Sequence, residues 1–191
     1  MDTIIQQNTD ILNETLRTIY DRRSVRLYLD RPVPIELVGR VIDAGKMAPS
    51  DMNHQPWKFY VLTIPDTIRA FSRQIQTCME GLSHHFAAVF GQVADPIFHG
   101  APVVILLAAP TKNEWAALDL GMCAQNMMLA ARSLGLDSCP VGLAKYVQKT
   151  SIVSTLNLDP RDEVFLAVVL GYGAERPEPH ARVANNVIFI P

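Results

Sequence analysis

The 191-residue sequence has few cysteines and almost no net charge, and each shortage excludes a class of protein. Cys78, Cys123 and Cys139 are odd in number and lack both CxxC and zinc-ligand spacing, which argues against a disulfide framework or a zinc finger. Free thiols favour a reducing compartment, so we expect a cytoplasmic protein. A net charge of −2 provides no overall positive field that would draw the chain to nucleic acid or an anionic membrane.

Other signals are missing as well. The segment MDTIIQQNTD has no basic stretch followed by an apolar core, and no apolar run reaches the roughly 18 to 20 residues that a membrane-spanning helix needs. We therefore expect neither a membrane nor a nucleic-acid partner. The phosphate-binding patterns GxGxxG and GxxxxGK(S/T) do not occur. Four histidines lack metal-ligand spacing and receive no role: His54, His84, His85 and His99.

Apolar residues alternate between helical and strand spacing along the chain, which predicts a single α+β domain over residues 1–191. An amphipathic helix is expected over residues 10–20, with one apolar face made by Leu12, Leu16 and Ile19. Pro34 opens a second helix, which ends before Pro49. Its inward face is expected to consist of Leu37, Val38, Val41, Ile42 and Gly45.

Three near-continuous apolar runs predict the buried strands of a central sheet: WKFYVLTI (57–64), PVVILLAA (102–109) and VFLAVVLGY (164–172). The longest helix is expected over residues 113–134, before Gly135. It is apolar or small on nearly every side, which indicates a core helix or one that packs partly on a second subunit. The tail ends in a strand-like VIFI, which needs a sheet edge in its own chain or in a partner.

The segment RRSVR (residues 22–26) concentrates positive charge in a chain that has little net charge. If the preceding helix continues, Arg22 and Arg26 share a face, whereas an extended chain places Ser24 and Arg26 on one side. Either way, a guanidinium and a second polar group converge. Planar guanidinium forks and a hydroxyl suit a phosphate. A solvated helix end, where cations are favourable, explains the same charges without a ligand.

The loop APSDMNHQP (48–56) leads directly into a predicted strand and carries Ser50, Asn53 and Gln55. Amide side chains donate and accept hydrogen bonds in one plane, which suits the edge of a heteroaromatic ring. The alternative is a loop whose Asp, Asn and Pro residues only form turns and caps. Trp57, at the start of the strand, is expected to be a core residue rather than a stacking platform for a ligand.

Taken in order, these segments resemble the FMN-dependent nitroreductase family. RRSVR is followed about 25 residues later by AP-S-x-x-N-x-Q-P-W-x-F. AALDLGMCAQNMMLAARSLGLDSCPVG is similar to the family's central helix and following strand, and FLAVVLGYGAERP to its penultimate strand and turn. The resemblance covers about residues 15–182. It implies an α/β/α sandwich with a mostly antiparallel central sheet, in a homodimer with two FMN sites at the interface. The C-terminal strand would be exchanged, and the tail (174–191) would extend over the partner subunit.

The resemblance also implies which residues bind FMN. One group holds the phosphate and ribityl chain, and it comprises Arg22, Arg23, Ser24 and Arg26. Within it, Arg23 lies near the ring or chain and is a candidate for stabilising the anionic edge of the reduced flavin. Arg182 matches a basic residue of the tail that closes on the phosphate.

A second group is the loop that approaches the flavin, and it comprises Pro49, Ser50, Asn53 and Gln55. Asn53 and Gln55 are implied at the ring edge, and Ser50 at the FMN of the other subunit. A third group presents backbone amides to flavin N5, and it comprises Pro140, Val141 and Gly142.

Two positions depart from the family's pattern. Many members have Glu-Gly where this chain has Val141-Gly142, and often GYP where it has Gly171-Tyr172-Gly173. Backbone donors remain, so hydrogen bonding to N5 is possible. The acidic group that lies near the nicotinamide site in some members is missing, so the choice between NADH and NADPH stays open. The chain is also short for the family, which implies reduced helical cover over the pocket.

The implied activity is that of an FMN-dependent oxidoreductase. A reduced nicotinamide passes hydride to flavin N5 and leaves, and an electron-poor small molecule such as a nitroaromatic or a quinone then takes the electrons in the same pocket. The flavin carries the chemistry, so no catalytic side chain and no metal is expected. Members of the fold also remove halogens, reduce enones, oxidise azolines or fragment flavin. A non-catalytic flavin-binding or storage protein is the alternative from another class.

Overall fold

The central sheet of the computed structural model, which describes residues 13–83, 88, 94–184 and 186–190, has the strand order β1-β2-β4-β3. Every neighbouring pair of these strands is antiparallel. The strands are β1 (Lys58–Leu62), β2 (Val103–Pro110), β3 (Asp137–Val141) and β4 (Asp162–Gly171). The α+β class and the antiparallel central sheet predicted from the sequence are confirmed, as are the three predicted strands, with slightly different ends.

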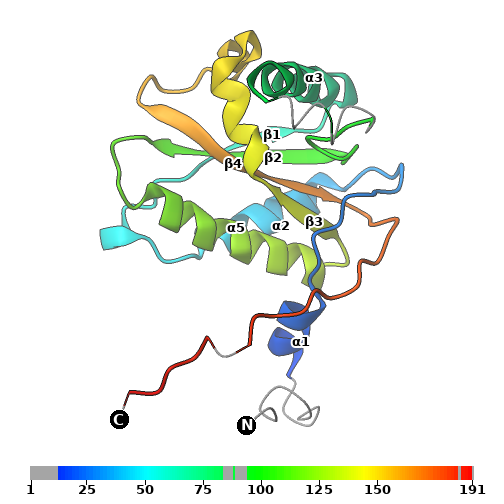
Figure 1. The fold of residues 1–191 in the computed structure, drawn as a ribbon, viewed down its shortest axis with the longest axis vertical. Helices are drawn as coiled ribbons and strands as arrows, with labels where there is room; N and C mark the ends of the chain where they lie inside the picture. Colours follow the sequence, from blue (N-terminus) through cyan, green and yellow to red (C-terminus); the bar gives the residue numbers. More distant parts are fainter. Residues whose placement is uncertain (1–12, 84–87, 89–93, 185, 191) are drawn as a thin grey trace.

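Helices cover both faces of the sheet (Figure 1). On one face lie α2 (Ile35–Lys46) and α5 (Ala116–Ser133), and on the other α3 (Pro65–Leu82) with two 3-10 segments, η3 (Gly142–Lys149) and η4 (Ser151–Leu156). The first described helix is α1 (Glu14–Asp21), which confirms the described part of the helix predicted over residues 10–20. Residues 10–12 lie outside the described residues. A short 3-10 turn, η2 (Asp51–Asn53), separates α2 from β1.

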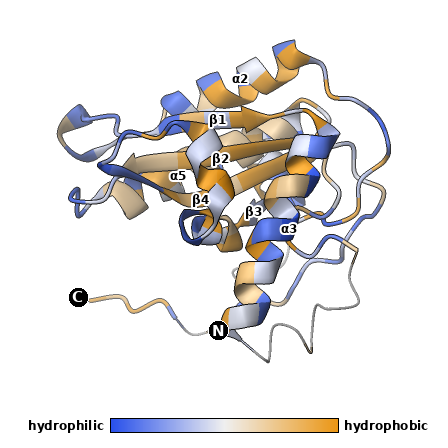
Figure 2. Ribbon diagram, turned by 90° about the horizontal axis from the view of Figure 1, so that it is seen from above, coloured by the Kyte–Doolittle hydropathy of each residue, from blue (hydrophilic) through white to orange (hydrophobic). Residues whose placement is uncertain are grey.

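Two cores arise from the alternation of side chains along the strands. In β2, Val104, Leu106 and Ala108 pack with α3 and η3, and the intervening Ile105 and Leu107 pack with α2 and α5. All seven residues from Val103 to Ala109 are buried, which explains why the run reads as continuously apolar. Figure 2 shows β2 as hydrophobic along its length, whereas α3 mixes hydrophobic and hydrophilic residues. Trp57 is buried in the core, as predicted.

The helices α2 and α5 approach each other closely at a glycine. A Cβ atom added at Gly45 would lie 2.7 Å from Met127 Cγ and 3.0 Å from Cys123 Sγ, whereas one added at Gly39, in the same helix, would meet nothing within 4 Å. Gly45 thus sets the distance between the two helices that support the loop before β1.

The two glycines make a matched pair for a stability measurement. Gly39→Ala is expected to raise the free energy of unfolding by about 0.5–1 kcal/mol, because alanine is the better helix former. Gly45→Ala gains the same propensity but overfills the contact with α5, so it should be less stable than Gly39→Ala by about 1–3 kcal/mol. Urea unfolding of both variants measures this difference. Equal free energies of unfolding in the two variants would show that α2 and α5 can move apart without loss of stability.

Several apolar surfaces stay exposed in the single chain. No residue of α1, all of which is described, is buried. The longest helix was predicted to be buried on nearly every side, but in the single chain α5 exposes Leu118 (55%) and follows an exposed Trp115 (46%). Residues 187–190 form no strand with the described part of their own sheet, and their side chains are 69–89% exposed. The VIFI segment (187–190) therefore does not pair with an edge of the described sheet in its own chain.

Candidate functional site

The arginine-rich segment is extended and lies along β3. Helix α1 ends at Asp21, and Arg22 already has an extended backbone (ψ 131°). The Val25 N–H donates to the Ser138 carbonyl over 3.1 Å, and Ser24 forms a parallel bridge to Ser138. Of the two conformations considered from the sequence, the extended one is observed. It sends alternate side chains to opposite sides of the segment.

Arg22 is a half-buried cation that forms no ion pair with any carboxylate in the described part of the chain. Its Nη1 is inaccessible to solvent and finds no hydrogen-bond partner among the described residues. Burial lowers the pKa of Arg22, and the nearby charges of Arg182 and Arg23 lower it further. Three guanidinium groups therefore lie near one another where the tail passes the segment. Such an arrangement fits a bound anion, since a phosphate would satisfy the unpaired donor and offset the mutual repulsion.

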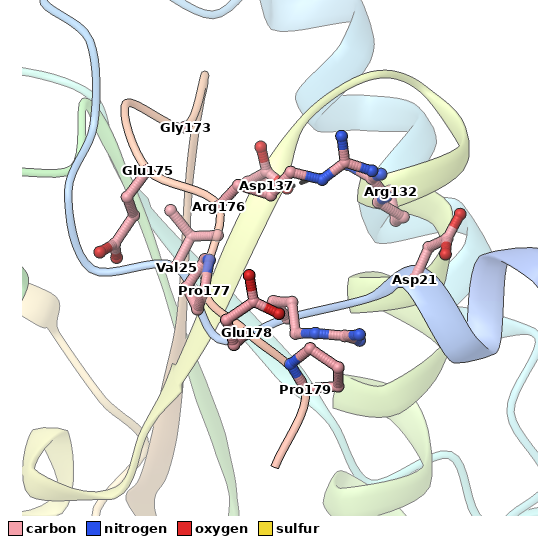
Figure 3. A pocket seen from close by; sticks show the side chains of 11 residues that line it. Asp21, Val25, Arg132, Asp137, Gly173, Glu175, Arg176, Pro177, Glu178 and Pro179 are labelled. Atoms are coloured by element: carbon pink, nitrogen blue, oxygen red, sulfur yellow. Dashed lines mark hydrogen bonds and ion pairs between the residues drawn. The ribbon is translucent and has the colours of Figure 1, made fainter.

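Arg23 faces a different environment. Its Nη1 donates to the carbonyls of Tyr20 (2.6 Å) and Arg22 (2.8 Å), which closes the C-terminal end of α1. It also lines a cleft of about 650 Å³ that Arg22, Ser24 and Arg26 do not line. Figure 3 shows Asp21, Arg132 and Asp137 around this cleft, with the tail residues 175–179 along one side. In the single chain, Arg23 thus binds backbone carbonyls, and its implied role near the flavin ring stays a prediction.

Arg26 is exposed, and its backbone N–H donates to Glu175 Oε1 over 2.5 Å. Its guanidinium also influences His99, whose pKa is lowered by burial and by the Arg26 charge. His99 received no role from the sequence, because nothing in its spacing marked it. It is brought there by Asp95, whose carboxylate accepts the N–H groups of Ile97, Phe98 and Gly100 and so closes a turn in which His99 has φ 59°.

The lowered pKa of His99 predicts a pH dependence of stability. A histidine with a lower pKa in the folded state than in the unfolded state (about 6.5) makes the unfolded state bind more protons, so stability falls as pH falls below that value. His99→Gln should reduce this loss between about pH 8 and pH 5.5, as measured by urea unfolding. His180→Gln, in the exposed tail, is the control. An unchanged pH slope in His99→Gln would contradict the assignment.

The segment after β3 offers accessible backbone. Pro140 and Gly142 are exposed, whereas Val141 between them is 5% exposed and packs in the core. A Cβ added at Gly142 would meet no atom within 4 Å, so space beside this backbone is open. β3 is an edge strand of the sheet, which is where a proline such as Pro140 is tolerated. This segment continues directly from the part of β3 that Ser24 and Val25 contact.

The loop 49–55 is strained and internally hydrogen-bonded. Three non-glycine residues have positive φ: Met52 (46°), Asn53 (57°) and Gln55 (48°). Ser50 Oγ accepts the Gln55 N–H over 2.9 Å, and Gln55 Nε2 donates to Asn53 Oδ1 over 3.2 Å. The side chains of Asn53 and Gln55 are exposed, as is Pro49. Strained conformations of this kind persist only where the surrounding structure holds them in place, and they are common at ligand sites.

The loop and the arginine segment lie at opposite ends of α5 (Figure 1). The Asp51 N–H donates to Asp119 in the first turn of α5, whereas Arg132 in the last turn pairs with Asp137 (3.4 Å) beside the arginine segment. At 1.5 Å per residue, Asp119 and Arg132 are about 20 Å apart along the helix. One chain therefore brings Arg22, Ser24, Arg26 and Arg182 to the flank of β3 but does not bring the loop to them.

A family model named Nitroreductase family matches residues 19–172, most of the chain. The chain belongs to the nitroreductase family. The match includes the arginine segment, the loop 49–55, α5 and β3, so the resemblance on which the sequence analysis relied is confirmed. Nitroreductases are oxidoreductases, and the protein is therefore an enzyme of that class.

Curated relatives within the nitroreductase family reduce aromatic nitro compounds, according to their names. A chloronitrobenzene nitroreductase of Comamonas testosteroni is 31% identical and aligns with 81% of this chain and 84% of its own. A 4-nitrobenzoate reductase of Pseudomonas putida is 29% identical, with coverage of 82% and 84%.

Solved nitroreductase structures share the fold. One from Bacteroides fragilis, determined with bound FMN, has a TM-score of 0.85 at 24% identity and covers 94% of this chain and 100% of its own. Another from Desulfitobacterium hafniense, also with bound FMN, has a TM-score of 0.87 at 23% identity, with coverage of 95% and 100%. At these identities the likeness establishes the α+β fold itself.

The described residues contain no group of three or more His, Cys, Asp or Glu side chains that could hold a metal ion. No helix in the same part of the chain has the length and apolar character needed to cross a membrane. Two of the histidines considered from the sequence, His84 and His85, lie outside the described residues.

Proposed function

We propose that this nitroreductase binds FMN and transfers electrons from NADH or NADPH to an electron-poor small molecule, such as a nitroaromatic compound or a quinone. The observation that carries the proposal is Arg22, a half-buried guanidinium with an unpaired Nη1 and two cationic neighbours. A dianionic phosphate is the kind of group that satisfies such a site. The relatives solved with FMN make the flavin phosphate the specific candidate.

The chain's own residues then have distinct tasks. Arg22, Ser24, Arg26 and Arg182 would hold the phosphate and ribityl chain, and the exposed backbone at Gly142 would donate toward the ring. When bound, FMN supplies the hydride- and electron-transfer chemistry. The protein contributes binding, orientation and the positive charge that stabilises an anionic ring. No described side chain is required as a nucleophile or as a general acid for this activity.

The loop 49–55 would complete the site of a second subunit. The loop contacts Asp119, which lies about 20 Å from Arg132 along α5. Yet the loop has the strained geometry and exposed amides of a ligand-facing loop. A homodimer accounts for both facts, because each loop could reach the flavin held by the partner's arginine segment. The exposed apolar side chains of α1, α5 and residues 187–190 provide surface for such an interface. The tail (174–191) would extend over the partner.

The electron acceptor and the nicotinamide donor are assigned as classes of compound. The two curated relatives act on nitroaromatic compounds by name, which favours this class of acceptor. At the position where many members carry a glutamate, Val141 is buried in the core and presents no charge. Discrimination between NADH and NADPH would therefore depend on other groups.

Steady-state kinetics test the function. Purified protein with FMN should oxidise NADH or NADPH in the presence of nitrobenzoate or benzoquinone, with the parallel initial-velocity lines of a ping-pong mechanism. Enones and haloarenes in the same assay distinguish the other reductions of the fold, whereas azoline oxidation is tested with the azoline as electron donor in place of NADH or NADPH. A flavin-binding protein without turnover with any acceptor would be a storage protein, and the proposed activity would be wrong.

A further inference from the structure

Asp119 is a buried carboxylate that the proposed activity leaves without a role. It lies in the first turn of α5, and it is 1% exposed. Its Oδ1 accepts the backbone N–H of Asp51 over 3.1 Å. Its Oδ2 is inaccessible to solvent and has no hydrogen-bond partner within the described part of the chain. A buried carboxylate that is only half satisfied lowers stability, so packing alone does not explain it.

The Asp51 N–H lies just before the part of the loop that carries Asn53 and Gln55. Immediately after it, the backbone enters the left-handed region at Met52, Asn53 and Gln55, which is unfavourable for residues with a Cβ. Hydrogen bonds within the loop close it on itself, among them Gln55 N–H to Ser50 Oγ, Asn53 N–H to the Ser50 carbonyl and His54 N–H to the Asp51 carbonyl. The bond to Asp119 is different, because it ties the loop to a helix that belongs to the core.

We propose that Asp119 is a positioning residue. Its carboxylate fixes the backbone at Asp51, and this holds the strained conformation that presents Asn53 and Gln55 to the flavin of the partner subunit. The inference rests on the proposed function for the identity of the ligand. The anchoring of the loop is a property of the chain itself, and it exists in the apoprotein. It can therefore be tested without any flavin.

The first test measures hydrogen exchange of the Asp51 amide in the apoprotein. Asp119→Ala should lose protection of this amide and of the loop 49–55. Asp119→Asn keeps an acceptor oxygen and should retain most of the protection from exchange. The matched pair at the donor is Asp51→Pro, which removes the N–H, and Asp51→Ala, which keeps the N–H but loses the side chain that lies 3.5 Å from His54. Ser50 has φ −141° and ψ 157°, which suits a residue before proline.

The second test measures FMN-loaded protein. Asp119→Ala and Asp51→Pro should each lower kcat/KM for the acceptor about 10- to 100-fold at full FMN occupancy, since a misplaced positioning group costs rate of this order. The visible circular dichroism of the flavin should change in both. Asp119→Asn and Asp51→Ala should stay within about threefold of the parent. The double variant Asp119→Ala with Asp51→Pro should be no worse than either single variant, because both remove the same bond.

Parent-like exchange, kcat/KM and flavin dichroism in Asp119→Ala would overturn the inference. If Asp119→Ala does not fold, the two Asp51 variants provide the test. The inference would then be overturned if Asp51→Pro and Asp51→Ala had the same hydrogen exchange in the loop and the same kcat/KM. Failure of the proposed function has a different signature, namely a parent protein that binds no FMN or is not reduced by NADH or NADPH. The exchange measurement keeps its meaning in that case, since it concerns the apoprotein.

Discussion

Arg22→Met is expected to weaken FMN binding while leaving the apoprotein at least as stable as the parent. The methionine keeps much of the apolar stem but removes a guanidinium whose Nη1 is buried and unpaired within the described residues. Loss of one charged hydrogen bond to phosphate is worth about 1.5–3 kcal/mol, so the Kd for FMN should rise about 10- to 100-fold. Adding Arg26→Ala should give a protein that loses its flavin on desalting.

The opposite directions of these two effects make the experiment informative. Stability of the apoprotein is measured by urea unfolding, and FMN affinity by fluorescence titration. Arg73→Met, an exposed arginine on α3, is the control and should change neither quantity. If the double variant retained stoichiometric flavin, the arginine segment would not be the phosphate site. If Arg22→Met markedly destabilised the apoprotein, Arg22 would be a structural residue rather than an anion-binding residue.

Two inactive variants are expected to restore activity when they are co-expressed. One chain carries Arg22→Met with Arg26→Ala, and the other carries Asn53→Ala with Gln55→Ala. If each site combines the arginine segment of one subunit with the loop of the other, a hybrid dimer has one site without any substitution. With random assortment, about half of the dimers are hybrids, so about a quarter of the parent's sites should be intact. Retained FMN and acceptor reduction both measure this.

The reference for this experiment is a mixture of the separately purified variants, measured before subunits can exchange. It should remain inactive, which shows that restoration needs assembly of both chains. A co-expressed sample as inactive as this mixture would contradict the shared site. In that case the loop and the arginine segment would serve the same chain, and the distance of about 20 Å along α5 would have to be closed by a movement of the loop.

The elements predicted from the sequence were those with long apolar runs, together with the helices α1 and α2, whose apolar residues share one face; α3, which also has a buried face, was not predicted. β2 and β4 have long apolar runs because both of their faces are covered, and α2 has the spacing of a helix with one buried face. β3 was reached only through the resemblance to nitroreductases, because DSCPV is short, polar at its start and interrupted by Pro140. A local pattern cannot distinguish such an edge strand from a loop.

The candidate site divides in the same way. Arg22 and Ser24 were candidates already from the density of arginine in the sequence, and the structure adds that Nη1 of Arg22 has no hydrogen-bond partner among the described residues. His99 and Asp119 could not, because their positions depend on contacts across the chain: His99 approaches Arg26, and Asp119 reaches Asp51. The separation of the loop from the arginine segment is likewise a tertiary property. No spacing in the sequence reveals that the two groups lie at opposite ends of α5.

The proposed function requires that the protein carry FMN and accept electrons from a reduced nicotinamide. The near-ultraviolet and visible absorbance of the freshly purified protein, followed by anaerobic addition of NADH and then of NADPH, tests both properties. We expect flavin absorption bands that bleach with at least one of the two, and the one that bleaches them identifies the donor. A colourless protein that cannot be reconstituted with FMN would contradict the proposed function.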